Sequence, residues 1–123
     1  YFLDLFFGER EEKLYEACLD AMGRLLACHL DAEGDTDSVQ LNMRKIVENA
    51  LKCGASSVLL SHNHPSGVAH PSPADNATTL SVFDALRTVG VELADHIIVA
   101  DDDFVSLRHN GLLPERKGNG YGI

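Results

Sequence analysis

Residues 61–75 read SHNHPSGVAHPSPAD and come directly after a short apolar run. His62 and His64 are two positions apart, so on an extended strand both side chains point to the same side. Asp75 stands eleven positions after His64, just inside a segment with helical spacing. Two imidazoles and one carboxylate are the protein ligands of many catalytic zinc sites, in which water takes the fourth position. The stretch therefore predicts a strand, a loop and a helix start that hold a metal ion together.

The same stretch also has a purely structural interpretation. The run Ser72-Pro73-Ala74-Asp75 is typical of a helix N-terminus, with serine at the N-cap, proline at the first helical position and an acid in the first turn. The acid would also favour the positive end of the helix dipole. Both interpretations hold if the helix N-terminus directs Asp75 toward the histidines. His70 is either a spare ligand or a solvated loop residue.

Apolar spacing outside this stretch predicts strands that alternate with helices. The acidic residues 31–38 contain no large apolar side chain before Val39, which is typical of a solvated loop. Alternating strands and helices indicate an α/β layered fold. Strands are predicted over residues 13–19, 24–30, 57–61, 91–100 and 104–107, and helices over residues 41–53 and from 72 to the glycine at 90.

A chain of 123 residues suits one domain with one core. The first residue is Tyr1, so we expect a segment of a longer protein. Residues 1–10 are predicted to be an N-terminal arm from a preceding region, and the apolar start of this arm favours a helix that packs on the domain. Residues 11–113 form the domain, and the Gly-rich residues 114–123 form a C-terminal tail.

Composition excludes several classes of partner. The formal charge is −9, from 19 acidic and 10 basic residues, and no basic stripe is visible. Phosphate contacts dominate affinity for nucleic acid, so neither direct nucleic-acid binding nor binding to an anionic membrane is expected. No apolar run approaches the roughly 20 residues that span a bilayer. Three cysteines without C-x-x-C spacing favour a reducing, cytoplasmic compartment.

The combined motifs resemble a known family. His62-Asn63-His64, followed at fixed spacing by Ser72 and Asp75, resembles the metal-binding motif of the JAMM (MPN-plus) metalloproteases. The chain is similar, more closely, to the catalytic domain of the bacterial RadC proteins. Three stretches carry this likeness, residues 62–67, 71–75 and 95–99, and it covers roughly residues 11–113.

The resemblance implies both a fold and a site. The fold would be the JAMM/MPN fold, a three-layer α/β/α arrangement with a mixed β-sheet like that of cytidine deaminases. Zn²⁺ would be bound by His62, His64 and Asp75. Ser72 would help to stabilise the tetrahedral intermediate. The implied activity is that of a metallopeptidase or isopeptidase-type hydrolase acting on a peptide or protein substrate.

One position departs from the family pattern. RadC proteins that resemble this chain usually carry a general-base glutamate at the head of the helix before the histidine strand, and the shared register places Lys45 there. A protonated lysine cannot accept the proton of a metal-bound water, and its charge disfavours a nearby cation. Glu48, one turn later, either substitutes as the base or pairs with Arg44 or Lys45 on a solvated helix face. One turn displaces a carboxylate by about 5 Å, whereas a base acts within about 3 Å of its target, which favours the pairing.

Two further histidines are interpreted as structural rather than functional. His96 follows Asp95 and could suggest a catalytic pair, but it sits within an apolar strand, which favours a structural, hydrogen-bonded histidine. His29 is interpreted in the same way. The sequence thus predicts a zinc hydrolase whose activity Lys45 would impair, because the general-base glutamate is missing. The alternative is a non-catalytic metal-binding or protein-interaction module associated with DNA repair or mobile elements, and neither hypothesis predicts an oligomeric state.

Overall fold

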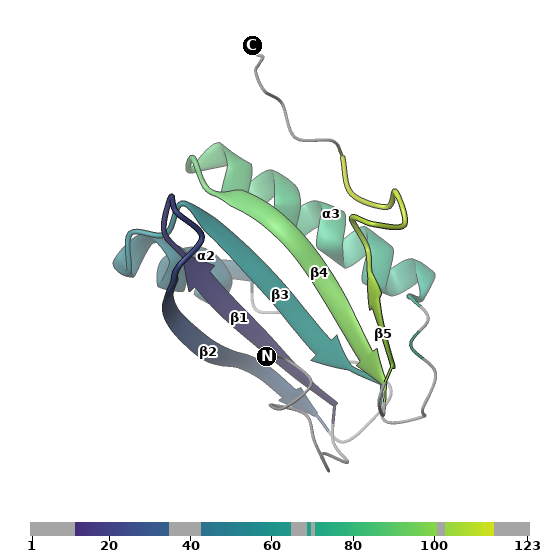
Figure 1. The fold of residues 1–123 in the computed structure, drawn as a ribbon. Coiled ribbons are helices and arrows are strands. Elements are labelled where there is room, and N and C mark those ends of the chain that lie inside the picture. Colours follow the sequence, from purple (N-terminus) through teal and green to yellow (C-terminus); the bar gives the residue numbers. More distant parts are fainter. Residues whose placement is uncertain (1–11, 35–42, 65–68, 70, 101–102, 115–123) are drawn as a thin grey trace.

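The computed structural model describes residues 12–34, 43–64, 69, 71–100 and 103–114. Strands and helices follow one another along the chain, as the apolar spacing predicts (Figure 1). The N-terminal arm and nearly all of the C-terminal tail fall outside the described residues. The elements are β1 (Glu12–Leu19), β2 (Leu25–Gly34), α2 (Met43–Lys52), β3 (Ser57–Asn63), α3 (Pro73–Thr88), β4 (Glu92–Ala100) and β5 (Asp103–Ser106).

The five strands form one mixed sheet in the order β2-β1-β3-β4-β5. The β3–β4 pair is parallel, and the other three neighbouring pairs are antiparallel. Parallel neighbours need a crossover connection, and α3 supplies it. The carboxyl ends of β3 and β4 therefore lie side by side at one end of the sheet, the end from which α3 runs back (Figure 1).

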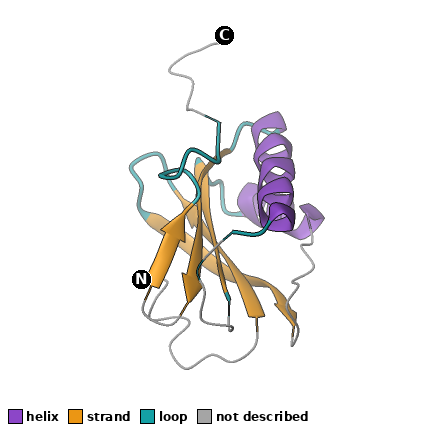
Figure 2. Ribbon diagram, turned by 90° about the vertical axis from the view of Figure 1, so that its right-hand side faces the viewer, coloured by secondary structure: helices purple, strands orange, loops and turns teal. Residues whose placement is uncertain are grey.

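Both described helices cover the same face of the sheet (Figure 2). α2 packs on β1 and β2, while α3 packs on β4. The core between these layers is apolar and buried, and the described residues thus form two layers of an α/β fold. The third layer that the resemblance implies stays a prediction. The core includes Leu14, Ile46, Leu60, Val82, Leu86, Leu93 and Ile98.

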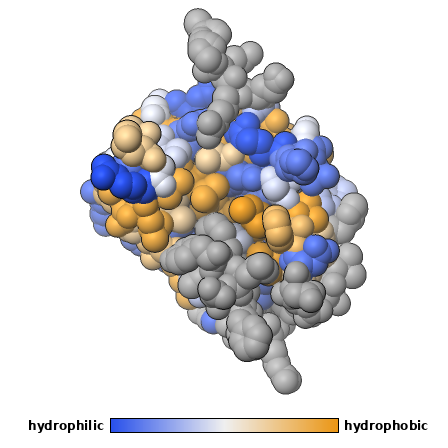
Figure 3. Space-filling view, viewed as in Figure 1, coloured by the Kyte–Doolittle hydropathy of each residue, from blue (hydrophilic) through white to orange (hydrophobic). Residues whose placement is uncertain are grey.

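The other face of the sheet carries a second, smaller apolar cluster. Ala17 and Val99 are each only 2% exposed, and three partly buried side chains pack against them. These three are Tyr15, Leu59 and Ile97. Figure 3 views the molecule from this side and shows apolar surface over the strands. Strand alternation separates this cluster from Leu14, Glu16 and Cys18, which point to the helices.

The largest correction to the predicted element boundaries falls in β2, while β3 continues two residues beyond its predicted end, to Asn63. Residues 31–34 were expected in a solvated loop, but β2 continues to Gly34 and its last residues pair with the start of β1. The register shifts between Leu14 and Tyr15, and Asp31 is the extra residue of the resulting bulge. Backbone pairing with β1 therefore outweighs an acidic composition that disfavours strands.

Two expectations from composition can be compared with the structure. The three cysteines are free thiols, so no disulfide joins them. No helix in the described part of the chain has the length and apolar character needed to cross a bilayer. The cytoplasmic location stays a prediction.

Candidate metal centre

The two motif histidines meet at the carboxyl end of β3. His62 is 4% exposed and lies opposite Leu14 of β1, on the face that the helices cover. His64 follows the strand, and its N–H donates to the carbonyl of Val99 at 2.8 Å. The Nε2 atoms of His62 and His64 lie 3.0 Å apart. The prediction that residues two apart on a strand converge on one point is confirmed.

Asp75 both caps α3 and reaches the histidines. The Ser72 Oγ accepts the Asp75 N–H at 3.0 Å, and the Asp75 Oδ2 accepts the Ser72 N–H at 2.9 Å. This capping box confirms the predicted helix start, with Pro73 in the first turn. The Asp75 carboxylate also lies 3.4 Å from the His62 Nε2 and 3.2 Å from the His64 Nε2. The cap is therefore confirmed, and it leaves the Asp75 carboxylate beside both histidines, as the metal-site prediction requires.

The charge of Asp75 suits a cation. Burial alone would raise the pKa of this carboxyl, but the neighbouring His62 and His64 imidazoles and the hydrogen bond from the Ser72 backbone outweigh it and lower the pKa. Asp75 is therefore an ionised carboxylate beside two imidazole nitrogens.

The separations between these atoms fit a bound metal ion. Zinc bonds of about 2.0–2.2 Å in a tetrahedron place neighbouring ligand atoms about 3.3–3.6 Å apart. The two histidine Nε2 atoms lie 3.0 Å apart, the Asp75 Oδ1 lies 3.4 Å from the His62 Nε2 and the Asp75 Oδ2 lies 3.2 Å from the His64 Nε2, all within about 0.3 Å of this range. Two nitrogens and one carboxylate are also the donor set of catalytic zinc, which leaves one position open. The residues present therefore fit the ion that the motif implies.

Glu12 joins this group, and the sequence analysis missed it. One ligand atom each from Glu12, His62 and His64 lie within 4.8 Å of one another, which makes these residues a candidate metal group. Glu12 is 3% exposed and stands two residues before Leu14, the cross-strand partner of His62. The available signal was an acid directly before the predicted first strand, in phase with Leu14.

Asn63 holds the start of β1 beside the histidines. Its Oδ1 accepts the N–H of Lys13 at 2.6 Å, one residue beyond the last backbone pair between β1 and β3. The Asn63 side chain is on the opposite side of the strand from His62 and is only 4% exposed. This bond fixes the backbone next to Glu12.

His62 is held from its other ring nitrogen. The His62 Nδ1 lies 2.7 Å from the His96 Nε2, and the His96 Nδ1 lies 2.6 Å from the Thr79 Oγ1. Burial, and then the nearby His62, lower the pKa of His96 well below its ordinary value, so this ring is neutral. The predicted structural, hydrogen-bonded role of His96 is confirmed, but its partner is a candidate metal ligand.

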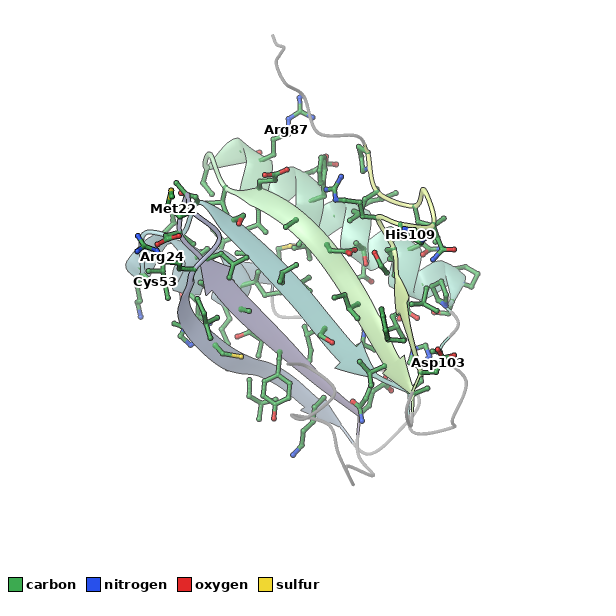
Figure 4. All side chains as sticks on the ribbon, in the orientation of Figure 1. Met22, Arg24, Cys53, Arg87, Asp103 and His109 are labelled. Atoms are coloured by element: carbon green, nitrogen blue, oxygen red, sulfur yellow. The ribbon has the colours of Figure 1, made fainter. Side chains whose placement is uncertain are left out.

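Asp95 anchors the segment that carries His96. Its Oδ1 accepts the His96 N–H at 2.7 Å and the Arg108 N–H at 3.0 Å, and its Oδ2 accepts the Ser106 hydroxyl. The Arg108 side chain in turn donates to the Leu93 carbonyl at 3.0 Å. Asp95 and Arg108 thus tie β4 to the segment that returns through β5. In Figure 4, Asp103 marks the start of β5 at the end of the sheet where β4 finishes.

The α2 residues that sequence reasoning considered lie on the exposed part of that helix. The Arg44 Nε donates to the Glu48 Oε2 at 3.0 Å, which is the pairing that the sequence analysis favoured. The Lys45 Nζ donates to the Leu30 carbonyl at 3.2 Å. A catalytic role for Glu48 stays a prediction. His70 lies outside the described residues.

Comparison with known proteins agrees with this geometry. Residues 1–112 match the family described as the RadC-like JAB domain. The chain belongs to this family. Relatives of this RadC-like JAB domain include a UPF0758 protein of Photobacterium profundum, 37% identical over 113 residues, which are 92% of the chain and 50% of the relative. A UPF0758 protein of Photorhabdus laumondii is 38% identical over 112 residues, 90% of the chain and 48% of the relative.

A third relative comes from a different genus. A UPF0758 protein of Paraburkholderia xenovorans is 35% identical over 111 residues, which are 89% of the chain and 44% of the relative. The RadC-like JAB domain thus spans about half the length of the curated relatives it matches.

Proposed function

We propose that this RadC-like JAB domain is a zinc-dependent hydrolase of peptide or isopeptide bonds. The observation that carries the proposal is the convergence of both histidine Nε2 atoms and the Asp75 carboxylate within 3.0–3.4 Å, with Glu12 beside them. His62, His64 and Asp75 would hold the metal. When bound, zinc lowers the pKa of a water ligand and polarises a carbonyl group. The charge of −9 supports a peptide or protein substrate over a nucleic acid.

Glu12 is our candidate for the general base. Its carboxylate belongs to the group around the histidines and is shielded from bulk water. Glu48, by contrast, lies on an exposed helix face in an ion pair with Arg44. A base must lie within hydrogen-bond reach of the proton that it takes, directly or through one water. With Glu12 in this role, Lys45 need not impair the reaction, because the base does not come from α2.

Ser72 is our candidate for the oxyanion donor. Its oxygen accepts the Asp75 N–H, and this bond uses a lone pair and leaves the hydroxyl proton for another acceptor. The capping box places this hydroxyl next to a proposed metal ligand. A hydrogen bond from Ser72 to the oxygen that gains charge at the scissile carbonyl would stabilise the transition state.

Hydrolysis assays on the zinc-loaded protein and on Glu12→Gln test the proposal. Linear peptides and isopeptide-linked conjugates serve as substrates, and mass spectrometry follows the release of new amines. We expect cleavage that a chelator abolishes and a rate at least about 100-fold lower in Glu12→Gln. Zinc stoichiometry should be equal in both proteins, because glutamine removes only the proton acceptor.

Three other results would contradict parts of this account. Equal cleavage by Glu12→Gln would exclude Glu12 as the base. Loss of zinc from Glu12→Gln would make Glu12 a metal ligand instead. Stoichiometric zinc without cleavage of either substrate class would favour the alternative, a non-catalytic metal-binding or protein-interaction module.

A further inference from the structure

Behind the candidate metal centre, a hydrogen-bonded chain links two of its proposed ligands. It runs from the backbone carbonyl of Asp75 through Thr79 and His96 to the Nδ1 of His62, with separations of 2.7, 2.6 and 2.7 Å. Thr79, His96 and His62 are 0%, 2% and 4% exposed, so water does not compete for these bonds. This series of hydrogen bonds begins on α3, passes through His96 of β4 and ends at His62 of β3.

The direction of every bond in this chain follows from its first member. The Thr79 hydroxyl has one proton and donates it to the Asp75 carbonyl, which cannot donate in return. Towards His96, the Thr79 oxygen can therefore only accept, so the proton between them belongs to the His96 Nδ1. Among the described residues the buried His96 ring forms hydrogen bonds only with a hydroxyl and another imidazole, with no carboxylate bonded to it that would balance a charge, so it carries one N–H and its Nε2 is an acceptor. The proton between the two rings then belongs to the His62 Nδ1.

We propose that Thr79 and His96 are positioning residues that hold His62 in its Nδ1–H tautomer and so present a bare Nε2 to the metal ion. Neither side chain would touch the metal or the substrate. The hydrogen bond that a ligating histidine makes through its other nitrogen fixes its tautomer and its ring orientation. Here the chain also returns to Asp75, so the positions of two ligands depend on the same set of buried bonds.

This proposal rests on the metal centre proposed above, but its first test needs no metal. In the zinc-free protein, ¹⁵N NMR of the imidazole rings distinguishes a protonated ring nitrogen from a bare one. We expect a proton on the Nδ1 of both His62 and His96, and none on the Nε2 of either ring. A proton on the His96 Nε2 would overturn the proposal whatever the zinc affinity.

The second test replaces Thr79. Thr79→Val keeps the shape but removes the acceptor, so the His96 proton should move to Nε2, where it donates to the His62 Nδ1. The His62 Nε2 would then carry the remaining proton and would have to lose it before binding a cation. We expect zinc affinity, measured by competition with a chelator, to fall about 10–100-fold, while the ¹⁵N signals report the tautomer change. Thr79→Ser restores the hydroxyl and should restore both readouts.

Thr88→Val is the matched control. Thr88, at the end of the same helix, donates to the carbonyl four residues back at 2.9 Å, as Thr79 does, but its side chain is exposed. Its loss should leave zinc affinity and both tautomers unchanged. Equal affinity and unchanged tautomers in Thr79→Val, or a failure of Thr79→Ser to restore them, would overturn the proposal. Absence of zinc binding by the unaltered protein would instead contradict the metal centre, and the tautomer measurement would still decide the role of Thr79.

Discussion

Glu12 acquires its proposed role from a neighbouring strand rather than from its own sequence context. It opens β1, and its carboxylate meets the two histidines because Leu14, two residues later, pairs with His62. Asn63 then fixes the intervening backbone through Lys13. The Asn63 side chain therefore contributes, together with the pairing of β1 and β2, to the position of the proposed base.

Replacement of Asn63 tests that dependence. Asn63→Ala would remove the acceptor of the Lys13 N–H, and loss of a partly buried hydrogen bond costs about 0.5–1.5 kcal/mol of folding free energy. We expect a loss of this size in urea unfolding, together with slower hydrolysis, because Glu12 is no longer held. Zinc stoichiometry should not change. The comparison variant is Asn110→Ala, whose side chain makes an exposed bond to the Ser106 carbonyl at 2.9 Å. An Asn63→Ala protein as stable and as active as this control would contradict the role of Asn63.

Helix α3 combines an N-terminal cap with a proposed metal ligand, Asp75. One capping box satisfies the first turn and directs Asp75 at the histidines, and Thr79 in the next turn supports His96. Local helix chemistry therefore sets the geometry of a site that lies mostly on the sheet.

Loss of the N-cap should lower both the unfolding free energy of the protein and its affinity for zinc. Ser72→Ala removes the acceptor of the Asp75 N–H, and such changes cost about 0.5–2 kcal/mol. We expect this loss in chemical unfolding of the zinc-free protein. Zinc should also bind more weakly, since Asp75 is less well held. Ser81→Ala, at an exposed position of the same helix, is the control and should alter neither. Unchanged zinc affinity in a destabilised Ser72→Ala protein would contradict the claim that the cap positions Asp75 for the metal.

A second buried polar cluster lies between α2 and the sheet. Glu16 is fully buried, and the Asn49 side chain donates to Asp31 at 2.9 Å and to Glu16 at 3.3 Å. Burial, and then the hydrogen bond and charge of Asp31, raise the pKa of Glu16 well above its ordinary value of 4.5. Glu16 thus keeps its proton in the folded protein at neutral pH. The β1–β2 turn, with Met22 and Arg24, lies at the end of the sheet opposite the candidate metal centre (Figure 4).

This protonated carboxyl predicts that the domain loses stability as pH rises. Below pH 4.5 the folded and unfolded chains both carry the proton, so the stabilisation is complete there. As pH rises above that value only the unfolded chain releases the Glu16 proton, which lowers the unfolding free energy by about 1.4 kcal/mol per pH unit. Up to pH 6.5 the neutral, buried His96 opposes this change, because the unfolded chain binds a histidine proton that the folded protein does not, so the net fall is expected above pH 6.5. Urea unfolding over a pH series measures the slope. Glu16→Gln should flatten it, whereas Asp84→Asn at an exposed position should not. A slope that Glu16→Gln leaves unchanged would contradict this assignment.

Local signals predicted much of this fold, and long-range pairing accounts for what they missed. The spacing of His62 and His64 and the Ser72–Asp75 cap are each encoded within a few residues, and the structure confirms both. The place of Glu12 beside the histidines depends on a strand about fifty residues away in sequence. The role of Thr79 depends on His96 of β4 and His62 of β3. The family register along α2 places Lys45 at the position of the general base. In the folded domain, pairing within the sheet instead brings an acid from β1, Glu12, to the histidines.

The central claim is that His62, His64 and Asp75 hold one metal ion, and zinc titration of the purified domain tests it most directly. Isothermal calorimetry on the chelator-treated protein should give one zinc per chain, and His64→Ala and Asp75→Ala should each abolish or greatly weaken this binding. His109→Ala, which alters an exposed histidine after β5, should bind as the unaltered protein does. No zinc uptake by the unaltered domain, or equal uptake by the His64→Ala and Asp75→Ala variants, would contradict the account.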